Sequence, residues 1–428
     1  MKQKIAKLKH GLKNNKTIVG NIFSLGTLQI FNYIIPLITL PYVLRILGPE
    51  KFGVVAFMGA FVGYFLIIVN YGFSLTTTRD ISIHREDNKK ISEIFWNVIS
   101  IKLILSILSF IFSLIIVFSF EIFSNEYLVF LFSFIMIFGD VFFPIWMFQG
   151  MEKMKYITII NVIVKSLFLL PIFIFVKTID DYYLVPLISS LSFITTGIIA
   201  FIMAIRVFRI QFVAPSVEVM KYQLVEGWHV FVSTLFISLY TTSTTFILGL
   251  FTNNTVVGYY SSAEKVVKAF QGLVGIISQA AYPNVAQKLK GSKDKTIEFL
   301  QKITIIIGGI TFIMSITLFI GSELIVNLLF GKEFLNSVAI LKILSFMPFI
   351  IGLASIFINL TMLNFGYKKE VSKIYIKYAI ISIFISIPLT LLYNGVGMAI
   401  SVLLTEIFIT LDVFFFLKKK GINLIYNK

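Results

Sequence analysis

Long, continuous apolar runs recur along the whole chain, and each is about as long as a helix that crosses a membrane. A transmembrane helix takes about 20 residues, and 57% of the 428 residues are apolar while only 14% are charged. A soluble domain carries about 25% charged residues and needs a polar surface. The runs are also continuous rather than alternating, which disfavours a transmembrane barrel. The sequence therefore predicts an all-α, polytopic membrane protein.

The apolar runs predict about twelve transmembrane helices in two lobes of six. The expected spans of the first half are residues 20–43, 53–75, 94–119, 127–148, 157–176 and 184–205. Those of the second half are residues 229–251, 257–283, 303–322, 337–361, 374–393 and 397–416. The expected lobes cover 19–206 and 229–416, with a cytoplasmic linker at 207–228 and basic cytoplasmic tails at 1–18 and 417–428.

A faint internal repeat supports the two halves. The sequence FGVVA (52–56) opens the second expected span, and VGYYS (257–261) opens the eighth, at an offset of 205 residues. Six helices followed by six with the same topology indicate a parallel repeat about an axis normal to the membrane. A binding site between the halves is then expected.

The basic residues are distributed unequally between the loops of the predicted topology. The chain has a formal net charge of +16. With the amino terminus in the cytoplasm, the inside loops and tails hold 28 Lys and Arg, and the outside loops hold 4. This bias predicts an even number of spans with both termini cytoplasmic. It also favours anionic lipid, and not nucleic acid, as the partner of the basic residues.

Several kinds of chemistry are missing from the sequence. The chain has no cysteine, three widely separated histidines and no GxxxxGKS/T loop. Thiol catalysis, a histidine metal site and a nucleotide-driven motor are therefore disfavoured. The longest connections, about 323–336 outside and 206–228 inside, have no room for a soluble catalytic domain. We expect no cofactor, no metal and no enzymatic activity, and a function carried by the helix bundle.

The eighth expected span carries the most informative polar pattern. Residues at helical spacing form one polar or small face, which consists of Ser261, Glu264, Lys268, Gln271, Gly275, Ser278 and Tyr282. Glu264 and Lys268 are also an i,i+4 pair in the favoured order. Because polar groups are costly against lipid, this face predicts a helix that lines a water-filled path, with Glu264, Lys268 and Gln271 in contact with substrate. The alternative is an internal ion pair that only stabilises packing.

Three further residues are candidates for substrate contact. Arg45 ends the first expected span at the outer face, where the alternative is a simple interfacial anchor. Lys165 shares a helical face with Thr158 and Asn161 in the fifth span. His229 lies on the polar side of the seventh span.

Other ionisable residues also fall within the expected spans. Asp140 lies well inside the fourth span, and Glu406 lies near the middle of the twelfth. Asp140 and Glu264 are candidates for ion coupling, since an intramembrane carboxylate is a functional hypothesis by default. Lys102 and Lys342 lie nearer to span ends, and we expect their side chains to reach back to the interface.

Segments along essentially the whole chain carry a family resemblance in matching order. They are PLITLPYVLRILGPEKFGVVAF, NYGFSLTTTRDIS, PIWMFQGMEKMKYITIINVIVK, VVGYYSSAEKVV, YPNVAQ and LLFGKEFLNSVAILKIL. This set resembles the Wzx-type oligosaccharide flippases of the polysaccharide biosynthesis family, within the multidrug/oligosaccharidyl-lipid/polysaccharide exporter superfamily.

The resemblance implies a flippase of the bacterial inner membrane with two six-helix lobes. It would move undecaprenyl-diphosphate-linked oligosaccharide from the cytoplasmic to the periplasmic leaflet by alternating access, for O-antigen or capsule assembly. A polysaccharide polymerase and a chain-length regulator are the implied protein partners. Arg45 and Lys268 could hold the diphosphate. Two other functions stay open: a drug/cation antiporter of the same superfamily, and a membrane polysaccharide polymerase or ligase.

Overall fold

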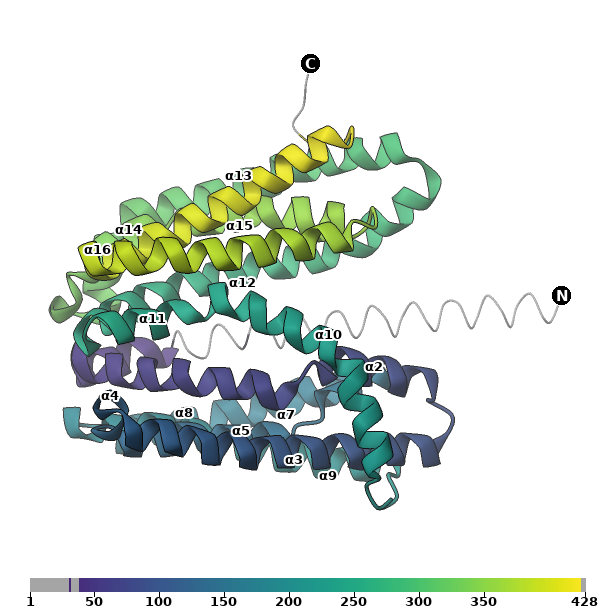
Figure 1. Ribbon diagram of the computed structural model, residues 1–428. Coiled ribbons are helices and arrows are strands. Elements are labelled where there is room, and N and C mark those ends of the chain that lie inside the picture. Colours follow the sequence, from purple (N-terminus) through teal and green to yellow (C-terminus); the bar gives the residue numbers. More distant parts are fainter. Residues whose placement is uncertain (1–30, 32–37, 425–428) are drawn as a thin grey trace. The chain divides into compact units, whose positions relative to one another are not determined.

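The computed structural model describes residue 31 and residues 38–424, and every regular element in this part of the chain is a helix (Figure 1). The predicted all-α class is confirmed. Eight helical stretches of the described residues are long and apolar enough to cross a membrane: Ile38–Ile83, Asn88–Ser119, Tyr127–Gly150, Met154–Phe175, Ile179–Phe208, Lys293–Phe330, Ser337–Met362 and Lys368–Lys419. The chain is therefore a multi-pass membrane protein. Most of the first expected span lies outside the described residues, and the count of twelve stays a prediction.

The chain divides into two compact units. In its described part, the first unit contains Phe61–Val176 and Tyr183–Leu235. In its described part, the second unit contains residues 38–60, Lys177–Tyr182 and residues 236–424. The lobe boundaries expected from the sequence stay a prediction.

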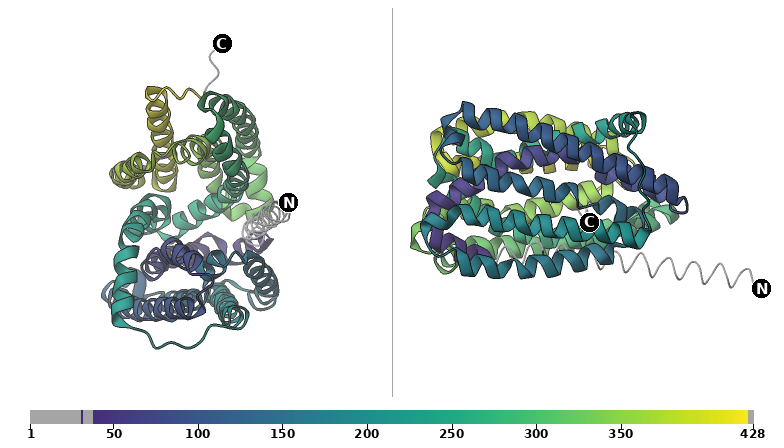
Figure 2. Two further views of the ribbon diagram at one scale, coloured as in Figure 1. Left: turned by 90° about the vertical axis from the view of Figure 1, so that its right-hand side faces the viewer. Right: turned by 90° about the horizontal axis from the view of Figure 1, so that it is seen from below.

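The first unit is a bundle of helices that lie side by side (Figure 2). Asp87 begins its longest helix, α3, by accepting a hydrogen bond from the backbone N–H of Lys90 at 3.0 Å, as a helix N-cap does. The elements from the first unit are α2 (Phe73–Ile83), α3 (Asn88–Ser119), α4 (Glu121–Ser124), α5 (Tyr127–Val141), α6 (Ile145–Gly150), α7 (Met154–Leu167), α8 (Leu169–Phe175), α9 (Leu184–Phe208) and the first part of α10 (Val217–Thr241). The short 3-10 helix η1 (Ile179–Tyr183) lies between α8 and α9 in sequence.

Two glycines bring α5 and α9 into close contact. A Cβ atom at Gly139 would lie 2.6 Å from the backbone nitrogen of Ile194, and one at Gly197 would lie 2.2 Å from the carbonyl oxygen of Gly139. Helices in membranes commonly associate through such small residues, because van der Waals packing replaces the hydrophobic effect there.

The second unit is also helical, and its last helix is really two. Its elements are α11 (Ser243–Phe251), α12 (Asn254–Gly291), α13 (Lys293–Ile325), η2 (Val326–Phe330), η3 (Lys332–Phe334), α14 (Ser337–Leu344), α15 (Met347–Ser355), η4 (Ile356–Met362) and α16 (Lys368–Lys419). Asn394 has φ 52° and ψ −131°, which breaks α16. A Cβ atom at Gly397 would lie 1.8 Å from the carbonyl oxygen of Leu389, so the chain turns back on itself there (Figure 1). This turn confirms the boundary predicted between 374–393 and 397–416.

The two segments of the internal repeat meet within the second unit. A Cβ atom at Gly53 would lie 1.7 Å from the carbonyl oxygen of Asn254, and one at Gly258 would lie 1.9 Å from that of Pro49. Residues 254 and 258 are equivalent to 49 and 53 at the repeat offset of 205. The contact is therefore reciprocal, as expected of two segments related by a pseudo-two-fold axis.

Candidate functional site

The site lies on α12, a helix of the second unit that carries many polar residues. Asn253 caps this helix by accepting a hydrogen bond from the backbone N–H of Val256 at 3.0 Å. α12 has 38 residues, enough to cross a membrane, but it is not among the eight described stretches that are also sufficiently apolar. Its polar residues therefore need partners or water inside the protein.

The predicted charge pair on α12 is confirmed. The Lys268 ammonium lies 3.0 Å from Glu264 Oε1, with side-chain exposures of 46% and 16%. Thr244, on α11, donates a hydrogen bond to the same carboxylate oxygen at 3.4 Å. Glu264 thus has one partner on its own helix, Lys268, and one on α11, Thr244. The ammonium of Lys268 is about half exposed, so it can bind a further anionic group.

A cavity of about 130 Å3 lies beside this pair. The polar groups that line it include Glu264, Lys268 and Gln271, three of the candidates that the helical spacing of the eighth span predicted together. The remaining lining residues come from five helices and are Thr244, Tyr260, Val267, Leu344, Met347, Ile351, Val402 and Glu406. The cavity therefore combines one ammonium and two carboxylates with an amide, two hydroxyl groups and apolar walls.

Two positions of the predicted polar face, Ser261 and Ser278, differ from its other end, Tyr282, which is 39% exposed. Ser261 is buried, and its hydroxyl has no partner among the residues that the structure describes. Ser278 is also buried, and its hydroxyl lies 2.7 Å from that of Ser355 on α15. The expected continuous water-lined face is therefore wrong at these two positions, because neighbouring helices cover them.

Lys265 lies outside that face and contacts an aromatic ring. Its ammonium lies 4.8 Å from the ring centroid of Phe52, which belongs to the same unit. A cation over the face of an aromatic ring is attracted by the ring quadrupole. This lysine therefore stabilises the contact between α12 and the helix that carries Phe52.

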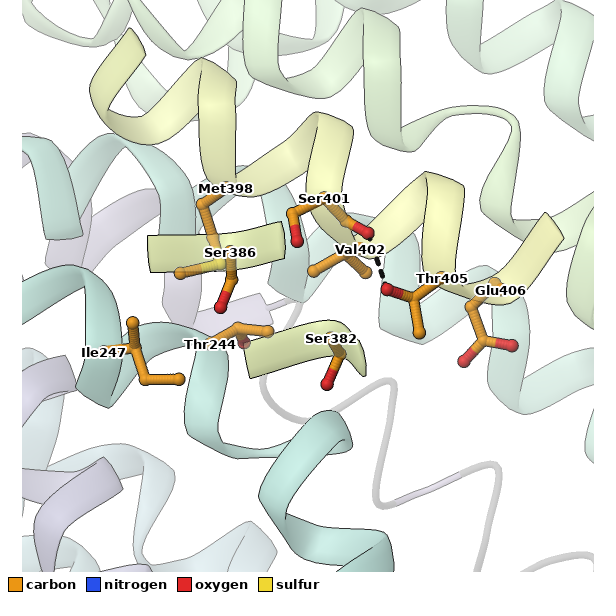
Figure 3. A pocket seen from close by; sticks show the side chains of 9 residues that line it. All are labelled: Thr244, Ile247, Ser382, Ser386, Met398, Ser401, Val402, Thr405 and Glu406. Atoms are coloured by element: carbon orange, nitrogen blue, oxygen red, sulfur yellow. Dashed lines mark hydrogen bonds between the residues drawn. The ribbon is translucent and has the colours of Figure 1, made fainter. Parts of the chain in front are cut away.

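A second cavity, of about 20 Å3, adjoins the first and shares Thr244, Val402 and Glu406 with it (Figure 3). It has room for about one water molecule. Four more hydroxyl groups line it, from Ser382, Ser386, Ser401 and Thr405, and Thr405 donates to the Ser401 carbonyl at 2.8 Å. Sequence reasoning noted Glu406 but missed this hydroxyl cluster. Its members belong to the two halves of α16 and to α11, which only the tertiary fold brings together.

Arg45 also belongs to the second unit but does not line either cavity. Its side chain is exposed, and its guanidinium donates a hydrogen bond to the carbonyl oxygen of Leu328 in η2. The Arg45 side chain thus satisfies a backbone carbonyl where the helical stretch Lys293–Phe330 ends. A role in substrate contact stays a prediction.

The other candidates lie in the first unit. Lys165 is half-buried, and its ammonium lies 5.6 Å from the ring centroid of Phe193. His229 is exposed on α10. Asp140 pairs with Lys102 at 3.0 Å, and Lys102 is only 2% exposed. The expectation that Lys102 reaches back to the interface is therefore wrong, because the half-buried carboxylate of Asp140 compensates its charge.

Comparison with known proteins gives relatives that match nearly the full length. A protein of Escherichia coli (strain K12) named "Putative O-antigen transporter" is 35% identical over 398 residues, which are 93% of this chain and 96% of the relative. A protein of Shigella dysenteriae with the same name is 30% identical over 391 residues, which are 91% of this chain and 98% of the relative.

Solved structures of similar fold are membrane transporters. The lipid II flippase MurJ in an inward closed conformation has a TM-score of 0.69 at 15% identity, over 94% of this chain and 87% of that chain. An inward-facing multidrug resistance MATE family transporter of the MOP superfamily has a TM-score of 0.63 at 15% identity, over 93% and 98%. At this identity the likeness concerns the fold alone.

The family predicted from the sequence is confirmed by a direct match. The family described as "Polysaccharide biosynthesis protein" matches residues 18–289, well over half of the chain. Together with the two full-length relatives, this match shows that the chain belongs to the polysaccharide biosynthesis protein family.

Proposed function

We propose that this protein is a flippase that moves undecaprenyl-diphosphate-linked oligosaccharide repeat units across the bacterial inner membrane. The cargo would pass from the cytoplasmic to the periplasmic leaflet, for assembly of O-antigen or capsular polysaccharide. The observation that carries the proposal is the charged cavity around Glu264 and Lys268 on the membrane-length helix α12. The names of the two full-length relatives support the same role.

The chemistry of the cavity suits such a cargo. A lipid-linked oligosaccharide has an anionic diphosphate and a large polar glycan, and neither crosses hydrocarbon unaided. The Lys268 ammonium would hold a phosphate oxygen through a charge-assisted hydrogen bond. Gln271 and the hydroxyl groups of Thr244 and Tyr260 would exchange hydrogen bonds with sugar hydroxyls.

The cavity is too small for a repeat unit in this conformation. Its volume of about 130 Å3 is far below the 300–1,000 Å3 or so that pockets for drug-sized ligands have. A repeat unit could therefore enter only after the helices around the cavity move apart. All residues that line the cavity belong to the lobe 229–416, so this widening would be a rearrangement within that lobe. We propose that alternating access also moves the lobes 19–206 and 229–416, each with six spans.

The proposal includes topology, coupling and partners. Both termini would be cytoplasmic, since this orientation places 28 basic residues inside and 4 outside. Glu264 or Asp140 would be the carboxylate that exchanges a coupling ion. A polysaccharide polymerase and a chain-length regulator would receive the product, and the protein itself would act as a transporter and not as an enzyme.

One observation favours the second candidate, a drug/cation antiporter. The cavity holds two carboxylates, Glu264 and Glu406, against the single ammonium of Lys268. The Glu406 carboxylate makes no ion pair with any described residue, so an organic cation could bind beside it. The two functions differ in their need for Lys268, because a cation site would tolerate its loss.

A deletion strain separates the two functions. Loss of a flippase should cause lipid-linked repeat units to accumulate in the cytoplasmic leaflet and should remove surface polysaccharide. Loss of an antiporter should leave the polysaccharide intact and raise sensitivity to cationic drugs. Complementation with Lys268→Ala should fail to restore polysaccharide at normal protein level, whereas the exposed-lysine variant Lys153→Ala should restore it.

A further inference from the structure

The first unit contains a separate, open cavity of about 560 Å3 where α2 ends and α3 and α10 begin. Figure 1 shows the start of α10 beside α2. The neighbouring connection, residues 84–87, is polar, so the cavity lies where spans meet water. All of its lining residues belong to the first unit, and none of them lines the two cavities beside Glu264.

The cationic groups of this cavity already have partners within the protein. Arg79 lies 2.9 Å from Glu226 and 3.0 Å from Asp80. Lys90 lies 2.6 Å from Glu93. Both side chains remain about half exposed, so the solvent-facing N–H groups of each could still bind an anion.

Two hydrogen-bond acceptors of the cavity lack a partner among the described residues. Gln223 is only 5% exposed, and its Oε1 atom has no partner among the described residues. The carboxylate of Glu218 forms no ion pair with any residue in that part of the chain. A buried acceptor such as Gln223 Oε1 is unfavourable without a partner, and the exposed carboxylate of Glu218 attracts a cation. Together these two groups call for a ligand that donates hydrogen bonds and carries positive charge.

The apolar part of the cavity is open at its rim. Ile83 is 66% exposed and Tyr222 is 56% exposed, although both line the cavity. In a multi-pass membrane protein, exposed apolar groups at a span end face lipid chains. The ligand should therefore have an apolar portion as well as a donor group.

We infer that this cavity binds the head group of a zwitterionic phospholipid with a primary ammonium, as in phosphatidylethanolamine. The ammonium donates to Gln223 Oε1 and to the Glu218 carboxylate, the phosphate lies near Lys90 and Arg79, and the acyl chains run along Ile83. Such a lipid ties the start of α10 to α2 and α3. The inference does not depend on the identity of the transported cargo.

Thermal unfolding of the delipidated full-length protein in detergent tests this site. Phosphatidylethanolamine should raise the unfolding midpoint by at least about 2 °C, and phosphatidylglycerol with the same acyl chains should raise it less. The soluble head group glycerophosphoethanolamine should have little effect, because it has no chains. Equal shifts with the two lipids would overturn the ammonium assignment, and a full shift with the soluble head group would overturn the lipid assignment.

Two variants connect the effect to this cavity. Glu218→Gln replaces an exposed carboxylate and should leave folding unchanged, while Gln223→Met removes the buried acceptor at similar volume. Each should lose at least half of the shift caused by phosphatidylethanolamine, and Gln211→Met, an exposed glutamine outside the cavity, should keep all of it. A shift that stays complete in Glu218→Gln contradicts the inference even if Gln223→Met does not fold.

Discussion

Lys102 donates hydrogen bonds from its ammonium to both the backbone carbonyl and the carboxylate of Asp140, at 2.9 and 3.0 Å. Asp140 lies at the point where α5 ends, and α6 begins only after Pro144. A helix end leaves backbone carbonyls without partners, which is costly away from water. The buried lysine on α3 therefore stabilises a broken helix, in addition to neutralising a carboxylate.

Loss of the Lys102 side chain should destabilise the first unit. Removing one partner of a buried ion pair typically costs about 3–5 kcal/mol, so Lys102→Met should lower the thermal unfolding midpoint in detergent. Lys102→Met combined with Asp140→Asn should recover part of the loss. The exposed control Lys153→Met should unfold like the natural protein. An unchanged unfolding midpoint in Lys102→Met would show that the Lys102–Asp140 pair does not stabilise the interruption between α5 and α6.

The repeat glycines should be sensitive to a single added methyl group. Gly53→Ala and Gly258→Ala place a Cβ atom within 2 Å of a backbone carbonyl oxygen, and overpacking of this kind costs about 1–3 kcal/mol. Both variants should unfold at a lower temperature, and by similar amounts, because the contact is reciprocal. Abundance in the membrane and the unfolding midpoint measure the effect.

Matched controls lie on the same two helices. At Gly59 and Gly275, a Cβ atom would have no neighbour within 4 Å in the described part of the chain. Alanine there should be neutral or slightly stabilising, since alanine favours a helix by about 1 kcal/mol over glycine. Equal destabilisation of all four variants would mean that the substitutions bend the helices, and that the close contact of Gly53 and Gly258 with the opposite backbone is not the cause.

Cysteine accessibility tests which part of α12 faces water, and the chain has no cysteine of its own. Cysteines at Lys268 and Gln271 should react with a membrane-impermeant thiol reagent, because both positions line the cavity. Cysteines at Ser278 and Val266 should not react, since both side chains are buried. Labelling of all four positions at one rate would contradict the assignment of the cavity.

The helices and the local charge pair could be predicted from the sequence. The break near Asn394 follows from the spacing of two apolar runs, and the Glu264–Lys268 contact follows from the i,i+4 geometry of one helix. Both depend only on residues near each other in the chain. The apolar runs also match both ends of the helical stretches Tyr127–Gly150, Met154–Phe175 and Ser337–Met362 to within three residues.

The contacts between helices could not be predicted in the same way. Lys102 and Asp140 are 38 residues apart, and nothing in either span specifies that α3 packs on α5 at this level. Ser261 fits the polar face by spacing, yet it is buried. A helical pattern gives the direction of a side chain, while its neighbours depend on the packing of the other helices.

The charge pair on α12 should not tolerate exchange if Lys268 holds the diphosphate. The double variant Glu264→Lys with Lys268→Glu keeps an ion pair four residues apart, so the fold should survive. The anion would then meet a carboxylate at the position of Lys268, and export of surface polysaccharide should stay defective. Restored export in this variant would reduce the pair to a packing role.

Translocation by the purified protein in proteoliposomes measures the central claim directly. Vesicles with undecaprenyl-diphosphate-linked oligosaccharide in both leaflets are treated with a membrane-impermeant glycosidase, and the cleaved fraction is followed over time. With the natural protein, cleavage should proceed beyond the outer-leaflet fraction to nearly all of the lipid. Lys268→Ala should slow this second phase by about tenfold or more, a loss of about 1.4 kcal/mol. Cleavage that stops at the outer leaflet with the natural protein, or an equal second phase with Lys268→Ala, would contradict the account.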